Sequence, residues 1–70
     1  MIHFKIDTAY IELYKLLKAC SLVASGGEAK VCIAEGYVTL NGQVETRKRC
    51  KLKSGDRVEF EGKVIMLEQA

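Results

Sequence analysis

Apolar and polar positions alternate at the start of the chain and then change to a helical spacing. Between residues 2 and 6 every second residue is large and apolar, the period-two pattern of a short strand with one buried face. Between residues 10 and 20 apolar residues recur at every third or fourth position, and Asp7 and Thr8 precede them as N-cap candidates. The pattern predicts an opening strand and a first helix over about residues 8–20.

A second helix is marked by its boundaries. Ser25 and Glu28 have the spacing of a capping box, in which the serine hydroxyl accepts from the backbone three residues on and the glutamate reaches back to the N–H of Ser25. Gly36 stands where a left-handed residue would end the helix. A helix of about ten residues is expected between them.

After residue 37 the period returns to two, and three turn signals divide the remainder of the chain. They are Asn41-Gly42, Ser54-Gly55-Asp56 and Glu61-Gly62. The order is therefore a strand, two short helices and then an antiparallel set of three to four strands. This order predicts an α+β fold.

Length and composition limit the class of protein. Seventy residues, 49% of them hydrophobic and 29% charged, suit one folded domain over residues 1–70. No apolar run approaches the roughly 20 residues that a membrane span needs, and the N-terminus does not resemble a signal peptide, so we expect a cytoplasmic protein. The spacing of Cys20, Cys32 and Cys50 matches no common metal or redox site, so all three are interpreted as reduced, buried residues, with no metal or cofactor.

Positive charge is concentrated in one part of the chain. The net charge is only +2, yet residues 41–57 carry six basic and two acidic side chains. If residues 47–53 are extended, alternate side chains project on one side about 6.7 Å apart, with Cys50 and Leu52 facing inward. The projecting residues would be Arg47, Arg49, Lys51 and Lys53, with Lys48 on the other side.

This row of cations has two interpretations. It complements a phosphodiester backbone, and the arginine fork favours phosphate because it can pair with two oxygens. It could instead be a charged edge strand that resists aggregation.

Other candidate contacts are fewer. Ser25 and Gly26 begin a helix whose free N–H groups could bind an anion, although Glu28 in the same turn opposes this; Lys30 either extends the basic surface or is a solvated helix lysine. Tyr37 is the one aromatic residue predicted to be available to a base. The others, Phe4, Tyr10, Tyr14 and Phe60, are interpreted as apolar-face residues.

The order of motifs resembles the RNA-binding domain of ribosomal protein S4, the alpha-L RNA-binding motif. The segments that carry the resemblance are Leu13–Leu17, Leu22–Ser25, Glu28–Lys30, Ile33–Gly42 and Lys53–Val58. The resemblance covers about residues 11–60. The length and the 44–51 run further resemble small stand-alone bacterial proteins of the YbcJ type.

The resemblance implies an RNA-binding surface made by the second helix and the adjoining strand and turn. Ser25, Lys30 and Asn41 match positions of the family motif. The chain departs from it at Glu12, where the family often has arginine, and at Gly26, where it has a basic residue. We hypothesise that the basic run compensates. Larger relatives append this domain to catalytic partners, whereas here no residues remain for a catalytic domain, so the resemblance implies a binding module and not an enzyme.

The sequence therefore predicts a module that binds structured RNA of the ribosomal or transfer RNA class, mainly through phosphates. The predicted partners are such an RNA, alone or in a ribosome or ribonucleoprotein, bound by a monomer. The alternative is a protein-interaction module whose basic run docks an acidic or ribosome-associated partner. The predicted contacts are Arg47, Arg49, Lys51, Lys53, Lys48, Lys30, Ser25, Gly26, Asn41 and Tyr37.

Overall fold

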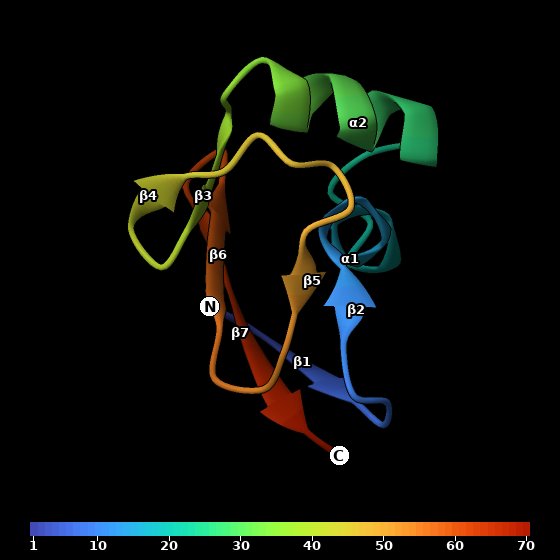
Figure 1. Cartoon of the computed structure of the whole chain (residues 1–70), viewed down its shortest axis with the longest axis vertical. Helices are drawn as coiled ribbons and strands as arrows, with labels where there is room; N and C mark the ends of the chain where they lie inside the picture. The colour runs from blue at the N-terminus through green and yellow to red at the C-terminus, as the bar shows by residue number, and fades with distance from the viewer.

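Seven strands and two helices make up the computed structural model, which describes residues 1–70 (Figure 1). Their bounds are β1 Ile2–Ile6, β2 Ile11–Glu12, α1 Leu13–Ala19, α2 Gly26–Ala34, β3 Val38–Leu40, β4 Gln43–Val44, β5 Lys51–Leu52, β6 Arg57–Phe60 and β7 Lys63–Gln69. The α+β class and the order of elements predicted from the sequence are confirmed. No helix is long and apolar enough to cross a membrane.

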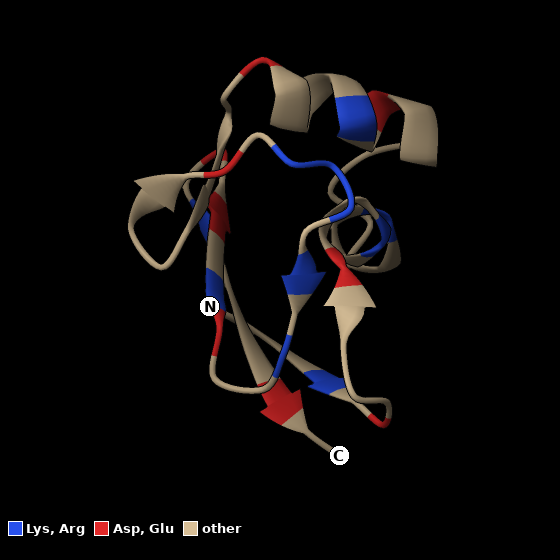
Figure 2. Ribbon diagram, in the orientation of Figure 1, with Lys and Arg blue, Asp and Glu red and all other residues tan.

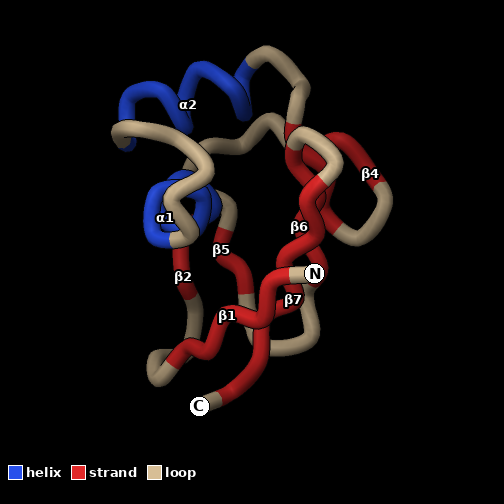
Figure 3. The backbone as a smooth tube through the Cα atoms, turned by 180° about the vertical axis from the view of Figure 1, so that it is seen from behind, coloured by secondary structure: helices blue, strands red, loops and turns tan.

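Five strands form one mixed sheet in the order β1-β7-β6-β3-β4. The strands after the helices pair antiparallel as expected, but β1 lies parallel to β7 at the edge, with Ile2 opposite Ile65. The short strands β2 and β5 form a separate antiparallel pair. Seen from behind, both helices lie to one side of the large sheet, and the β2–β5 pair lies next to α1 (Figure 3).

The core lies between the helices and the sheet, and no polar side chain is buried in it. Its fully buried residues include three leucines of α1, Ala29 and Ile33 of α2, and apolar residues of β3, β6 and β7. Cys50 and Leu52 are buried too, as the alternation predicted. The segment that carries the positive charges is therefore anchored by its own apolar side chains.

The start and end of α2 confirm the predicted boundaries. The Ser25 hydroxyl accepts a hydrogen bond from the Glu28 N–H at 3.1 Å. The Glu28 carboxylate accepts from the N–H of Ala24 at 2.7 Å, one residue earlier than a capping box predicts. Gly36 follows the helix with φ +84°, the left-handed conformation that glycine tolerates best.

The predicted turns are also confirmed. Asn41 and Gly42 both have positive φ and connect β3 to β4, and Glu61 and Gly62 do the same between β6 and β7. Positive φ at two successive residues matches the right-handed twist of the strands that such a turn connects. Gly55, at +96°, lies in the turn before β6.

The predicted start of the first helix is wrong. Helix α1 begins at Leu13, and its N-cap residue, Glu12, makes no side-chain cap. Two backbone carbonyls from far along the chain satisfy its first amides: Leu13 N–H donates to Cys50 at 2.9 Å, and Tyr14 N–H donates to Lys48 at 3.1 Å. Thr8, predicted as a possible cap, donates instead to the Tyr10 carbonyl at 2.9 Å.

The predicted strand over residues 47–53 is wrong for the same reason. Only Lys51 and Leu52 are in a strand, and Cys50 N–H donates to the Arg47 carbonyl at 3.2 Å, which closes a turn. The chain turns here because the carbonyls of Lys48 and Cys50 are directed to the amides of α1. Lys48 and Arg49 consequently occupy the tip of a turn instead of opposite sides of a strand.

Candidate nucleic-acid interface

The basic segment, residues 47–53, runs past the start of α1 and below α2. Figure 2 shows its basic part beside the single basic band on α2, with acidic segments at the edges of this region. The hydrogen bonds to the amides of α1 fix the segment to the helix. Its positive charges are thus held on a defined part of the surface.

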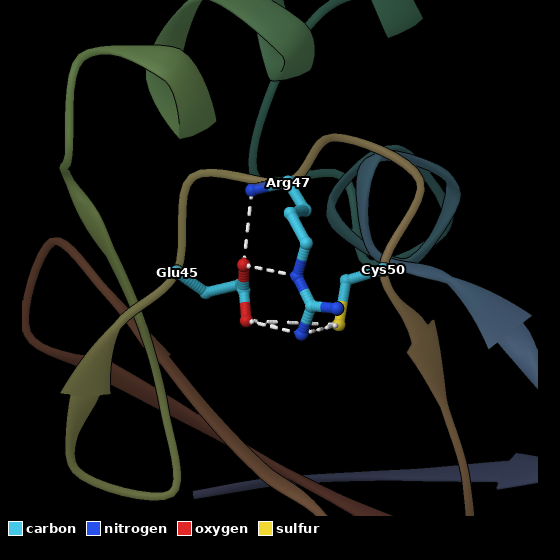
Figure 4. A network of polar contacts seen from close by, with 3 residues as sticks. All are labelled: Glu45, Arg47 and Cys50. Carbon is cyan, nitrogen blue, oxygen red and sulfur yellow. Dashed lines mark hydrogen bonds and ion pairs between the residues drawn. The ribbon is translucent and has the colours of Figure 1, made fainter.

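A side-chain network closes the turn at its N-terminal side (Figure 4). The Arg47 guanidinium donates from Nε and Nη2 to the two carboxylate oxygens of Glu45, at 2.9 and 3.0 Å, and the Arg47 N–H donates to the same carboxylate at 3.0 Å. The Cys50 thiol lies 3.8 Å from Glu45 Oε1 and 3.5 Å from Arg47 Nη2. Arg47, predicted as a phosphate contact, is therefore already engaged in a bidentate pair.

The network perturbs the titration of its members. Hydrogen bonds from the Arg47 side chain and backbone lower the pKa of Glu45 from 4.5 to about 2. Burial raises the pKa of the Cys50 thiol, and the nearby Glu45 carboxylate acts in the same direction. At neutral pH the turn is therefore held by an ionised glutamate beside a protonated thiol.

One aromatic ring collects cations from three parts of the chain. Around the ring centroid of Tyr14 lie Lys30 Nζ of α2 at 4.7 Å, Arg49 Cζ of the basic segment at 5.5 Å and Lys15 Nζ of α1 at 5.9 Å. These distances are within the reach of cation–π attraction. We call Tyr14, Lys15, Lys30 and Arg49 the Tyr14 cluster.

The ring also joins α1 to the start of α2. A β-carbon at Gly26 would lie 3.5 Å from Cδ2 of Tyr14, so the glycine and the ring are neighbours. The tyrosine is half-buried, with one part against α2 and the cations around the remainder. The Tyr14 cluster is thus built on a packed contact between two helices.

A second tyrosine repeats the arrangement with one cation. Lys51 Nζ lies 4.9 Å from the ring centroid of Tyr10, which is 45% exposed. Lys51 also lines an open hollow of about 470 Å³, together with Arg47, Arg49 and Cys50. Positive side chains therefore surround a concave surface on the basic segment.

Carboxylates neutralise only part of this charge. Glu12 pairs with Lys15 at 3.3 Å and lies 3.9 Å from Arg49, and Glu45 pairs with Arg47. Within the basic segment and the Tyr14 cluster, the cations that make no ion pair are Lys30, Lys48, Lys51 and Lys53. Glu12, where the family resemblance anticipated arginine, thus lowers the charge at the edge of the Tyr14 cluster without removing it.

The remaining predicted contacts are not all brought to this surface. Asn41 has a structural role: its side-chain oxygen accepts from the Arg57 N–H at 2.9 Å and its amide donates to Asp56 at 3.2 Å. Asp56 also accepts from the Lys53 N–H at 2.9 Å, which places Lys53 at this junction. Tyr37 lines a separate hollow together with two glutamates.

Ser25 and Gly26 lie at the start of α2, where the Ser25 hydroxyl is engaged with the helix backbone and Gly26 contacts the Tyr14 ring. Gly26 thus packs against the ring of the Tyr14 cluster from the start of α2. The sequence interpretation missed Tyr10, Tyr14 and Lys15, because both tyrosines fit a helical apolar stripe. Only the folded chain brings Lys30 and Arg49 to Tyr14, from 16 and 35 positions away.

The fold is that of a small domain of the S4 class. A family model described as the S4 domain matches residues 4–68, and the chain belongs to this family.

Two curated proteins are similar to this chain in sequence over most of their length. YbcJ of Escherichia coli (strain K12), named as a candidate RNA-binding protein, is 47% identical over 58 residues, which are 83% of each chain. RlbA of Bacillus subtilis (strain 168), named as a candidate ribosome maturation protein, is 42% identical over 57 residues, 81% of this chain and 80% of RlbA.

Solved structures agree with the fold. The solution structure of Escherichia coli YbcJ, described as revealing an alpha-L motif involved in RNA binding, superimposes with a TM-score of 0.75 at 42% identity, over 97% of this chain and 87% of YbcJ. Ribosomal protein S4e of Thermoplasma acidophilum superimposes with a TM-score of 0.67 over 81% of this chain and 30% of that protein. At 21% identity the second likeness shows the fold alone.

Proposed function

We propose that the protein is a non-catalytic module that binds structured RNA of the ribosomal class, mainly through phosphates. The observation that carries the proposal is the convergence of cations from α1, α2 and the basic segment on the ring of Tyr14. Three segments far apart in the sequence contribute to one positive surface. Resistance to aggregation would need no such convergence.

Phosphate is a better ligand for this surface than an unstacked base. The two tyrosines on it already have cations within 4.7 to 5.9 Å of their ring centroids, so their faces are occupied. A lysine held against a ring keeps N–H donors directed outward, and these can reach a phosphate oxygen. Fixed positions on two helices and an anchored turn suit the fixed phosphate spacing of a folded RNA.

The names of the relatives favour the same class of partner. YbcJ is named for RNA binding and RlbA for ribosome maturation, which together point to ribosomal RNA as the first RNA to test. Transfer RNA is the natural comparison, since it is also folded and of similar charge density. The whole chain, residues 1–70, is proposed to act as a single binding unit.

A matched pair of variants tests the proposal. At about 0.1 M salt, the counterions released when one phosphate is neutralised increase the affinity by somewhat less than about tenfold. Replacing Lys48 and Lys51 with alanine should therefore weaken binding to a ribosomal RNA fragment by at least about tenfold, measured by fluorescence anisotropy. The control variant replaces Lys5 and Lys63 with alanine. These substitutions remove the same amount of charge, but from β1 and β7.

The control variant should change the affinity by less than about threefold, because salt screens the attraction between the RNA and charges that lie far from the binding surface. Equal losses in the two variants would show attraction to the net charge and no defined site. If neither variant changed the affinity, the RNA surface would lie elsewhere. Binding to an acidic protein that persists after ribonuclease treatment, with no RNA binding, would favour the protein-interaction alternative.

A further inference from the structure

A second hollow lies on the other side of α2 from the Tyr14 cluster. It has a volume of about 410 Å³ and is lined by Glu28, Cys32, Tyr37, Phe60 and Glu61. We call it the acidic hollow. Its residues come from α2, the loop before β3, the end of β6 and the β6–β7 turn, so it is assembled by the fold and not by one segment.

The helical geometry separates the two surfaces. Residues advance by about 100° around a helix axis, so Glu28 and Cys32 lie close together in angle, whereas Lys30 lies about 200° from Glu28. Ala29 and Ile33 lie between them and are fully buried against the core. Helix α2 therefore presents a basic side to the Tyr14 cluster and an acidic side to the second hollow.

The charge and lining of the acidic hollow oppose a phosphate. Glu61 makes no ion pair, and Glu28 uses only one carboxylate oxygen, in its 2.7 Å bond with the Ala24 N–H. Burial raises the pKa of the Cys32 thiol, and the carboxylates of Glu28 and Glu61 act in the same direction. Lys63 faces Phe60 across the turn but forms no ion pair with either glutamate.

The same features suit a cationic side chain. Tyr37 is 65% exposed and lines the hollow together with the two glutamates, an unusual exposure for so large a ring. Val44, whose side chain lies beside Gly36, is 61% exposed. A guanidinium or ammonium group can pair with a carboxylate while it lies over an aromatic face. Exposed aromatic side chains such as Tyr37 are enriched at protein contacts, and so is arginine from a partner.

We propose that the acidic hollow binds an arginine or lysine side chain of a basic polypeptide. The domain would then hold RNA on one side of α2 and a basic protein segment on the other. This reassigns Tyr37 from the RNA surface to a protein contact. The inference does not depend on RNA binding, since the two surfaces share no lining residue.

The test uses the whole chain and an acetylated (Arg-Gly)₄ peptide as the probe. Titration of ¹⁵N-labelled protein, followed by ¹H–¹⁵N NMR, should shift the amides of Cys32, Tyr37 and Glu61 and leave those of Lys30 and Arg49 unchanged. A (Glu-Gly)₄ peptide is the opposite-charge control. Shifts spread equally over Glu35, Glu59 and Glu68 would overturn the proposal, because they would indicate general attraction to acidic residues.

Substitutions sharpen the result. The double variant Glu28→Gln, Glu61→Gln keeps a capping side chain at position 28 and removes both charges. It should weaken peptide binding by about fivefold or more, the effect of losing two surface ion pairs. The control Glu68→Gln, at the far end of β7, should change it by less than twofold; equal effects would overturn the proposal. Tighter RNA binding by the double variant, with RNA-induced shifts at Tyr37, would assign the hollow to RNA instead.

Discussion

Replacing Tyr14 with leucine removes the ring around which the cations gather and leaves every charge in place. A cation–π contact at an exposed site is worth about 0.5–1 kcal/mol. Lys30 and Arg49 come from other parts of the chain, so the loss of their two contacts amounts to about 1–2 kcal/mol. If these contacts hold the side chains where phosphates bind, the affinity for RNA should fall about five- to thirtyfold.

The slope of affinity against salt separates this effect from the loss of a charge. Tyr14→Leu should lower the affinity at every salt concentration without changing the slope, because the number of neutralised phosphates is the same. Lys30→Ala should reduce the slope by about 0.7–0.9. Tyr14→Phe, which keeps the ring, should bind within about twofold of the parent protein.

A matched control exists at Tyr10, which holds one cation instead of three. Tyr10→Leu should cost about two- to fivefold, the effect of a single contact. Thermal unfolding by circular dichroism establishes that each variant is folded at the assay temperature. Unchanged or tighter binding by folded Tyr14→Leu would refute the reasoning, since it would mean that the ring competes with RNA for Lys30 and Arg49.

Two further substitutions test the supports of the surface. Glu45→Gln should lower the melting temperature at neutral pH, and this difference from the parent protein should shrink as the pH falls from about 5 toward 2. The reason is that a carboxylate with a lowered pKa stabilises the fold only while it is ionised. A difference in melting temperature that does not depend on pH would contradict the role of the Arg47 pair. Asn41→Ala should cost about 1–3 kcal/mol in urea unfolding, from two lost hydrogen bonds to Arg57 and Asp56, with RNA affinity of the folded protein unchanged. An affinity loss without destabilisation would make Asn41 a contact after all.

The parts of the fold that the sequence predicted are those controlled by neighbouring residues. The Ser25 cap, Gly36 and the Asn41-Gly42 turn each depend on a few adjacent residues, and the structure has all of them. Alternation also predicted correctly that Cys50 and Leu52 are buried. Local chemistry was sufficient in these cases because tertiary contacts did not oppose it.

The incorrect predictions all concern contacts between distant segments. Alternation over residues 47–53 predicted a strand, but the carbonyls of Lys48 and Cys50 bond to the amides of α1 and bend the chain. No pattern in residues 8–20 could show that this distant carbonyl pair, and not Asp7 or Thr8, would complete the start of α1. The parallel pairing of β1 with β7 joins the two ends of the chain and is equally invisible locally.

The arrangement of the candidate site could not be predicted from the sequence. The concentration of charge identified the basic segment and Lys30, while their meeting point, Tyr14, was interpreted as an apolar-face residue. Arg47 illustrates the limit, since its charge is visible in the sequence but its bidentate pair with Glu45 requires the turn. Charge can be counted from a sequence, whereas the partner of each charge is decided by the fold.

The most direct test of the central claim is the dependence of RNA affinity on salt. Apart from Arg47, the cations of the Tyr14 cluster and the basic segment are Lys15, Lys30, Lys48, Arg49, Lys51 and Lys53, of which Lys15 and Arg49 also lie beside Glu12. If they neutralise four to six phosphates, the logarithm of the association constant for a ribosomal RNA fragment should fall with the logarithm of salt concentration at a slope of roughly −3 to −5. A slope near zero would contradict an RNA surface built on phosphate contacts.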